Sequence, residues 1–319
     1  MVTVLQKNWF MLGLVAVALT VVADSAGIVV TPGLWLKQHR GPDVVIVIIF
    51  LLSGLSLDTR QVRDGVSDFR GTMVALALIF MIAPLLALCF SAAPLQPGIL
   101  IGIFLVSAMP TTLSSGVVMS GAAGGNMVHS LLITILANTL AVVTIPVCLA
   151  LLLKFTGDSR IVEISQLPIM IKIGTLVLIP LIAGITLRRI FSASLQPFLP
   201  YTSTCNQLGI LAIVLMALCG GRPAIVSELG SIPSVIGAVF TFHLALVLAA
   251  LFLTRIFRIP KHKRESVILM GGQKTLPLSV IIQVSVFPEY GLALVVCVMH
   301  HIIHLVMDAY LIKHLRKME

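Results

Sequence analysis

The stretch GGQKTLPLSV, Gly271 to Val280, places a lysine inside a hydrophobic segment, after two glycines and before a proline. An ammonium group in hydrocarbon is costly, and a helix that holds Gly-Gly and Pro so close together is hard to keep continuous. The stretch therefore predicts a membrane span that is broken at Lys274.

The composition places this stretch in a membrane protein. Hydrophobic residues make up 58% of the chain and charged residues only 10%. Soluble domains carry roughly 25% charged residues, so this chain cannot cover a water-facing surface. Its long apolar runs predict an all-α integral membrane protein in a lipid bilayer. The net charge of +9 does not indicate a nucleic-acid partner, because the basic residues flank the apolar runs, where they set topology.

Ten transmembrane helices are expected from the apolar runs. Most of the 21 Lys and Arg residues fall in the segments on one side, which predicts that both termini are cytoplasmic, with the plasma (inner) membrane as the location. The expected spans are Trp9–Val29, Val44–Leu57, Thr72–Phe90, Gly98–Met119, Met127–Leu153, Pro168–Leu187, Thr204–Cys219, Ile232–Leu253, Val267–Phe287 and Gly291–Ile312.

These spans divide into two halves, residues 1–153 and 154–319. Because each half has an odd number of spans, the second half is inverted relative to the first. The second span of each half is short, and the fourth is broken, at MPTTLSSG (Met109–Gly116) and at GGQKTLPL. Interrupted helices at matching positions of two halves indicate the binding site of a transporter.

Two interpretations of the breaks are open. They are either kinks that Ser and Thr side chains fill, or two half-helix pairs that cross and form a binding site for a small solute. In the second case the polar side chains near the breaks converge on one spot. These side chains are Thr111, Thr112, Ser114, Ser115, Gln273 and Thr275.

MPTTLSSGVVMSGAAGGN (Met109–Asn126) and GGQKTLPLSV resemble the two crossover motifs of the bile acid:sodium symporter (SBF/BASS) superfamily. GLSLDTRQV (Gly54–Val62), NWFMLGL and MHHIIH also resemble that family, so the similarity spans the chain. It is strongest to the SBF-like branch of the cation/proton antiporter superfamily, which includes the orphan seventh member of the human bile-acid carrier family. The resemblance implies a core domain of spans three to five and eight to ten, and a panel domain of spans one, two, six and seven.

The resemblance also implies a cation site where the broken helices cross. Ser115 matches a liganding serine, whereas Gly116 stands where an asparagine is usual. Ser130 and Thr134 follow Asn126 by four and eight residues and match hydroxyl ligands one helical turn apart.

Three positions of the last broken span bear on the coupling ion. Gln273 matches a liganding glutamine, but Leu269 replaces the glutamate that the family places four residues earlier. Lys274 replaces an asparagine. We therefore expect Lys274 to supply internally the positive charge that sodium supplies in relatives. This puts sodium coupling in doubt and leaves Na⁺ or H⁺ as the possible coupling ion, with no other cofactor or metal expected.

Other ionisable residues lie within the expected spans. The last span carries His300, His301, His304 and Asp308, which either form a proton relay or only pack between helices. The family has a histidine at the position of His301, which favours a functional role for that residue. Asp24 falls inside the first expected span, so it either is functional or lies near an interface.

The sequence favours a secondary-active transporter that moves a small, organic anionic solute by alternating access. The alternative is a membrane regulator or sensor, of a calcium-homeostasis type, which keeps the transporter fold without net transport. An enzyme is not expected, because no nucleophile–base pair or phosphate-binding glycine loop is found. The substrate, the coupling ion and the oligomeric state stay open.

Overall fold

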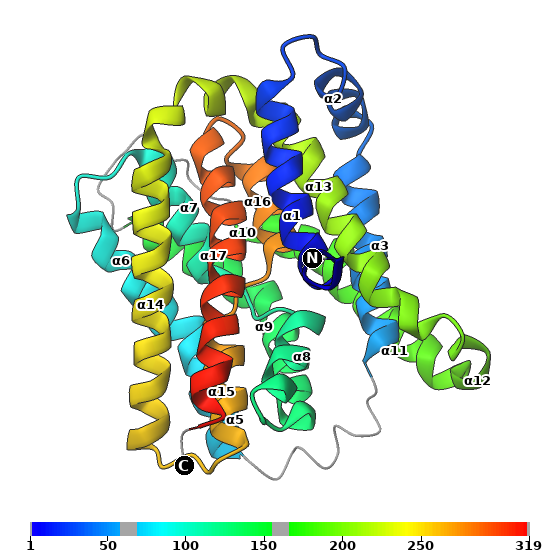
Figure 1. Ribbon diagram of the computed structural model, residues 1–319, viewed down its shortest axis with the longest axis vertical. Helices are drawn as coiled ribbons and strands as arrows, with labels where there is room; N and C mark the ends of the chain where they lie inside the picture. The colour runs from blue at the N-terminus through cyan, green and yellow to red at the C-terminus, as the bar shows by residue number, and fades with distance from the viewer. Residues whose placement is uncertain (1, 58–68, 155–165, 318–319) are drawn as a thin grey trace.

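A computed structural model describes residues 2–57, 69–154 and 166–317 of the chain. Every regular element in this part of the chain is helical (Figure 1). The chain is therefore an all-α integral membrane protein. The boundary expected between the two halves, after residue 153, falls at the end of a helix and just before residues that are outside the described ranges.

The helices follow the expected apolar runs closely. In the first part of the chain they are α1 (Val2–Ala23), α2 (Val30–Gln38), α3 (Gly41–Ser56), α5 (Phe69–Ala77), the π-helix η1 (Leu78–Ile82), α6 (Ala83–Cys89), the 3₁₀ turn η2 (Phe90–Ala92), α7 (Pro97–Ala108), α8 (Ser114–Ala122) and α9 (Met127–Lys154). In the second part they are α10 (Gln166–Ile173), the π-helix η3 (Gly174–Leu178), α11 (Ile179–Ile190), α12 (Ser192–Leu195), α13 (Leu199–Ser227), the 3₁₀ turn η4 (Leu229–Ser231), α14 (Ile232–Ile256), α15 (Lys263–Gly272), α16 (Leu276–Val286) and α17 (Gly291–Leu315).

Within the described residues, seven helices are long and apolar enough to cross a membrane. A pair bent by 77°, α2 with α3, makes an eighth if it is one span. Two further apolar segments, Trp9–Ala23 and Pro97–Ala108, are shorter. Multiple spans are thus established, while ten spans and the inverted repeat stay predictions.

The first expected span, Trp9–Val29, extends beyond the C-terminal end of the helix in the structure. Helix α1 stops at Ala23, and the carboxylate of Asp24 accepts hydrogen bonds from the N–H groups of Ile28, Val29 and Val30, at 3.0, 2.7 and 2.8 Å. Those bonds, chiefly the one from Val30, lower the pKa of Asp24 below its usual value. Asp24 therefore organises the turn into α2 instead of facing hydrocarbon inside a span.

The seventh expected span is too short. Helix α13 has 29 residues and continues past Cys219 through Arg222 and Pro223. The guanidinium of Arg222 donates to the carbonyls of Val21 and Val22, at 2.8 and 3.2 Å, where α1 ends. Free carbonyls at the end of α1 satisfy the half-buried guanidinium, so the charge does not end α13.

One group of helices packs around α3. Helix α3 packs against α11 and α13, and α13 also packs against α1 and α2. Gly54 of α3 and Gly184 of α11 each face the other helix's backbone so closely that a Cβ on either would collide with it. This close approach is typical of membrane helices joined through small residues. The group contains the segments expected for the panel domain.

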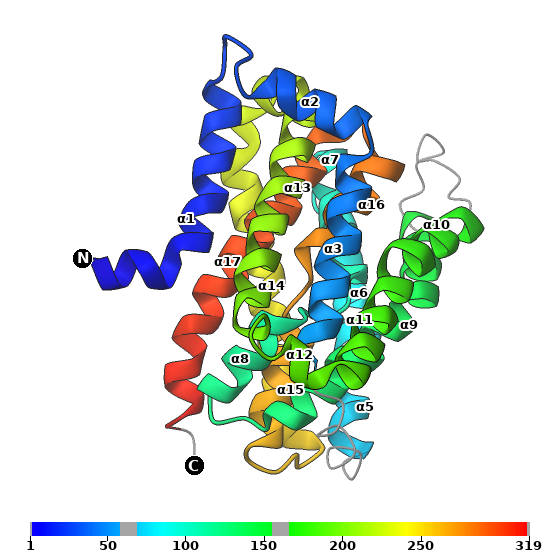
Figure 2. The same cartoon turned by 90° about the vertical axis from the view of Figure 1, so that its right-hand side faces the viewer.

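The second group contains the segments expected for the core domain. Helix α17 packs against α7 and α14, and α15 packs against α5, α8, α9 and α14. Two helices of this group are interrupted, α7–α8 and α15–α16. Figures 1 and 2 both show α7 and α16 in the upper half of the molecule and α8 and α15 in the lower half. The two breaks therefore meet near mid-height.

Candidate functional site

The two breaks are short extended segments that touch through their backbones. Pro110 disfavours the helical conformation of the residue before it, and Met109 is extended, with φ −74° and ψ 147°. In the other break Gln273 has φ −78° and ψ 147°, and Thr275 is extended as well. The N–H of Thr275 donates to the carbonyl of Pro110 at 3.0 Å. The expected crossing of two broken helices is therefore present.

The ammonium of Lys274 is buried at the crossing of the two broken helices. It donates to the carbonyls of Ile79, Ser107 and Met109, at 2.8, 2.9 and 3.0 Å, and only 2% of the residue is exposed. Three N–H groups on one ammonium match three acceptors. Two of the carbonyls belong to the C-terminal end of α7, where the helix dipole favours a cation. Lys274 therefore contacts half-helix carbonyls as expected and does not snorkel to an interface.

The third carbonyl comes from a local irregularity in the preceding span. In the π-helix η1 the N–H of Ala83 bonds to the carbonyl of Leu78, five residues earlier. In the same pattern, the carbonyl of Ile79 would accept a bond from the N–H of Pro84, but proline has no N–H. The ammonium of Lys274 replaces the missing donor. Pro84, which is 190 positions before Lys274, thus leaves one of the three carbonyl acceptors free, because it cannot bond to that carbonyl within its own helix.

A chain of buried hydrogen bonds leaves the crossing on the side of α17. The hydroxyl of Thr112 donates to Oε1 of Gln273 at 2.6 Å, and Nε2 of Gln273 donates to Oδ2 of Asp308 at 2.9 Å. The other oxygen of Asp308 lies 3.1 Å from Nε2 of His243 on α14. Asp308 is buried, so these two partners provide the bonds that a buried carboxylate requires.

Four buried histidines adjoin Asp308. The rings of His243, His300 and His304 form a triangle, with centroids 5.6 Å apart for His243 and His300, 5.2 Å for His300 and His304, and 5.8 Å for His243 and His304. His301 packs edge-on against His304 and against Phe10 of α1, and it also lies against the backbone of Lys274. The histidines thus pack α14, α17 and α1 together, and only His243 of the four bonds to Asp308 among the described residues, so a proton relay stays a prediction.

Helix α9 carries a polar ladder toward the crossing. The hydroxyl of Ser130 donates to the carbonyl of Asn126 at 3.1 Å, and that of Thr134 donates to the carbonyl of Ser130 at 2.9 Å. One turn further, the amide of Asn138 donates to the carbonyls of Thr134 and Thr111, at 2.9 and 3.4 Å. Asn138 therefore connects the ladder to the first break. The sequence analysis missed it, although it continues the spacing of four residues from Asn126.

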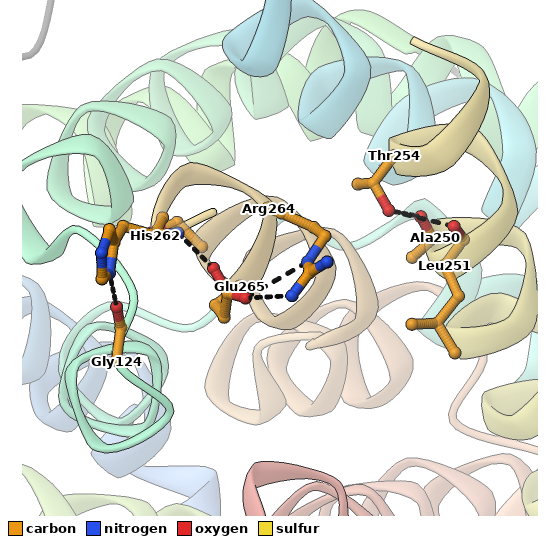
Figure 3. A network of polar contacts seen from close by, with 8 residues as sticks. Gly124, Ala250, Leu251, Thr254, His262, Arg264 and Glu265 are labelled. Carbon is orange, nitrogen blue, oxygen red and sulfur yellow. Dashed lines mark hydrogen bonds and ion pairs between the residues drawn. The ribbon is translucent and has the colours of Figure 1, made fainter. Parts of the chain in front are cut away.

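The lower end of this ladder is tied to the start of α15, shown in Figure 3. The backbone of Asn126 bonds to His262 and to the hydroxyl of Ser266, at 2.7 and 2.9 Å. His262 contacts the carbonyl of Gly124 and caps α15 together with Glu265, whose carboxylate also binds Arg264. Asn126 and Ser130 therefore lie in a bonded anchor below the crossing, and Thr134 lies between that anchor and the break.

The remaining predicted site residues surround the crossing at different depths. Thr111 and Thr275 are buried, and Ser115 is half-buried. Among the described residues, the hydroxyl of Thr111 has no hydrogen-bond partner. Ser114 begins α8, but its side chain is outside the described parts. The structure thus brings Thr112 and Gln273 into direct contact and places Lys274 against carbonyls of the first break, while binding by the whole predicted set stays a prediction.

Gly116 lies directly against the bond between Thr112 and Gln273. A Cβ at this position would lie 2.6 Å from the hydroxyl of Thr112 and 2.9 Å from Oε1 of Gln273. Only glycine leaves room for the bond between those two side chains. Gly116 therefore belongs to the same packed crossing as Thr112 and Gln273.

Comparison with known proteins gives a match over almost the whole chain. A family profile described as the SBF-like CPA transporter family covers residues 8–317. The probable sodium/metabolite cotransporter BASS4, chloroplastic, of Arabidopsis thaliana is 26% identical over 280 residues, which are 83% of this chain and 63% of the relative. The chain thus spans less than two thirds of that relative's length.

Animal and fungal proteins are similar as well. The sodium/bile acid cotransporter 7-B of Xenopus laevis is 26% identical over 299 residues, which are 90% of this chain and 84% of the relative. The solute carrier RCH1 of Candida albicans is 28% identical over 191 residues, 54% of this chain and 46% of the relative. These relatives carry transporter names, in agreement with the broken helices.

Proposed function

This chain belongs to the SBF-like CPA transporter family, and on that premise we propose that it is a secondary-active transporter that works by alternating access and needs no sodium. Its cargo is a small, organic anionic solute bound at the crossing of the two broken helices. No catalytic step is part of this proposal. The observation that carries it is the ammonium of Lys274, held by three carbonyls at the crossing.

A fixed ammonium opposes a sodium ion at the same place. Two unit charges about 4 Å apart repel by about 4 kcal/mol at the effective dielectric of such a site. The carbonyls that would attract sodium are also already bonded to Lys274. A sodium ion at the crossing would therefore meet an unfavourable electrostatic field and no free carbonyl ligands. An anionic solute, in contrast, is favoured near a fixed positive charge.

Asp308 supplies the acidic group that Leu269 lacks. It comes from α17 instead of α15, and it bonds to Gln273, the residue that matches a liganding glutamine. The amide is thereby held with its oxygen toward Thr112, in the first break. The carboxylate is held by Gln273 and His243, on the side of α17, whereas the ammonium of Lys274 is held by carbonyls of α7 and η1, so the two charged groups have separate partners.

The same proposal includes ten spans in an inverted five-plus-five arrangement, with both termini in the cytoplasm and the plasma (inner) membrane as the location. The basic residues of the loops support it. Cysteines introduced singly at Lys37 and Lys261 should be labelled from opposite faces of sealed vesicles by an impermeant maleimide. Labelling of both from one face contradicts the proposed topology.

Transport is tested with purified protein in liposomes, by uptake of radiolabelled taurocholate, lactate and benzoate with and without sodium and at several pH values. We expect uptake of at least one anion that does not change when sodium is replaced by choline. Gln273→Ala and Thr134→Ala should reduce it at least tenfold, because both residues order the crossing. Thr139→Ala is the matched control, since its exposed hydroxyl bonds to the carbonyl four residues earlier just as Thr134 does.

Lys274→Asn, which restores the residue of relatives, should lower uptake and introduce dependence on sodium. An absolute sodium requirement of the parent contradicts the proposed role of Lys274. Binding of anions without uptake of any of them favours the membrane regulator or sensor, which keeps the fold without transport.

A further inference from the structure

The sixth expected span changes its packing partners along its length. It forms one continuous helix, Gln166–Ile190, made of α10, the π-helix η3 and α11. Helix α10 packs against α9 of the core group (the helices of the crossing), whereas α11 packs against α3 of the panel group (the helices around α3). Figure 2 shows α10 at the right edge of the molecule and α11 below it. The border between the two groups therefore passes through this span at η3, which contacts both α9 and α3.

Polar contacts agree with this division of the span. In α10 the ammonium of Lys172 donates to the hydroxyl of Ser285 in α16 at 2.6 Å, and the carboxylate of Asp43 in α3 lies farther away, at 3.7 Å. In α11 the guanidinium of Arg188 donates to the carbonyl of Leu55 in α3 at 2.6 Å. The two halves of one helix are thus attached to different groups.

The π-helix η3 has the same bonding pattern as η1, but no side chain fixes it. In η3 the N–H of Ile179 bonds to the carbonyl of Gly174, and Pro180 has no N–H for the carbonyl of Thr175. In η1 the ammonium of Lys274 bonds to the equivalent carbonyl. Among the described residues no side chain donates to the carbonyl of Thr175. Pro180 thus removes a helical hydrogen bond at the junction of α10 and α11, and no side chain restores it.

The junction also has room to bend. A Cβ at Gly174 would meet no atom within 4 Å, so close packing does not require a glycine there. Glycine favours a helical backbone about fivefold less than alanine does, so Gly174 loosens the start of η3. A small apolar gap separates Leu176 and Val177 of η3 from Leu278 of α16. The backbone and its surroundings are therefore both permissive at the same place.

We propose that η3 is a hinge between the two groups of helices, about which α10 moves with α9 and α16 while α11 stays with α3. The inference rests on alternating access in the proposed function, and it specifies where the chain bends during that motion. Helices bend sharply at prolines and π-helical turns, and π-helical turns are frequent at functional sites. During the bend Lys172 keeps its bond to Ser285 and changes its distance from Asp43.

The first test stiffens the hinge without changing its packing. Gly174→Ala adds a methyl group in open space and favours the helical backbone about fivefold. We expect it to lower uptake of taurocholate, lactate or benzoate into liposomes at least threefold, with no drop in melting temperature. Adding Pro180→Ala, which restores the missing N–H, should lower uptake further. The matched control is Gly237→Ala in α14, where a Cβ also meets no atom within 4 Å, and it should leave uptake unchanged.

The second test measures the motion without transport, on the full chain in nanodiscs. Pairs of spin labels are introduced through unnatural amino acids at exposed positions, and electron–electron double resonance gives the distance distribution of each pair. Ile171 with Leu151 joins α10 to α9, and Ile182 with Ile48 joins α11 to α3. Ile171 with Val44 joins α10 to α3, across the proposed hinge. We expect one narrow distance for each of the first two pairs and a distribution at least twice as wide for the third.

Gly174→Ala should narrow the distribution of the pair across the hinge, and Gly237→Ala should leave it unchanged. Equal widths for all three pairs overturn the inference. So does uptake by Gly174→Ala that equals uptake by Gly237→Ala, or a melting temperature of Gly174→Ala below that of the control, because damage to the fold then explains the loss. The expected widths, combined with no uptake of any anion by the parent, leave the hinge in place and contradict the transport function.

Discussion

Lys274, in the break between α15 and α16, and Lys172, in α10, both lie in apolar segments of the chain, but their surroundings differ. Lys274 is buried and gives each of its three donors to a backbone carbonyl. Lys172 is partly exposed, has one hydroxyl partner, and lies at a longer distance from a carboxylate. The first ammonium is a fixed part of the fold, and the second has fewer partners within the described residues.

The number of hydrogen bonds that each ammonium donates distinguishes the two lysines better than their positions in the sequence do. A buried ammonium with three acceptors cannot leave them without leaving carbonyls unpaired, and it cannot take a new partner without losing an old one. A partly exposed ammonium with one strong hydrogen bond, such as that of Lys172, loses little free energy when it changes its partner. Four substitutions test this difference, ordered by the loss of stability that we expect.

Lys274→Met should have the largest effect. It leaves the carbonyls of Ile79, Ser107 and Met109 without their donor, and each buried unsatisfied group costs about 1–3 kcal/mol. We expect a loss of at least about 3 kcal/mol, seen as a large drop in melting temperature of the purified protein or as failure to accumulate. A variant that melts like the parent would show that the bonds to Lys274 are not structural.

Asp308→Leu should come next. The amide of Gln273 and the ring of His243 then lose their common acceptor in a buried place, at a cost of about 2–4 kcal/mol. Asp308→Asn keeps an acceptor of the same shape and should recover a large part of that loss. Thermal unfolding of both variants measures the difference. Equal melting temperatures would mean that Asp308 acts through charge alone.

Gly116→Ala should cost less, about 1–3 kcal/mol, because one added methyl group must push Thr112 and Gln273 apart. Gly237→Ala in α14 is the control, since a Cβ there meets no atom within 4 Å. That control should be neutral or slightly stabilising, because alanine favours a helix over glycine by about 1 kcal/mol. If both variants melt alike, the crossing is looser than the contacts indicate.

Lys172→Met should have the smallest effect on stability, at most about 1 kcal/mol, because a partly exposed pair contributes little. A drop in melting temperature as large as that of Lys274→Met would remove the distinction between the two lysines.

Much of the site's location was predictable from local patterns. Pro110 and the Gly-Gly pair before Gln273 break helices by local rules, so both breaks are found where the sequence predicts them. The ends of the spans were less predictable. Asp24 follows the end of α1 although the expected span continues to Val29, and Arg222 lies inside α13 although the expected span ends at Cys219.

The sequence by itself determined the class of protein, the broken spans and the presence of an unusual lysine, because composition, periodicity and proline chemistry act within one segment. Only the tertiary structure decided what that lysine and Asp308 contact. Lys274 reaches the carbonyl of Ile79 across 195 positions, and Asp308 reaches Gln273 from another helix. Such bonds depend on how helices pack and cross, and no periodicity in a single segment specifies that.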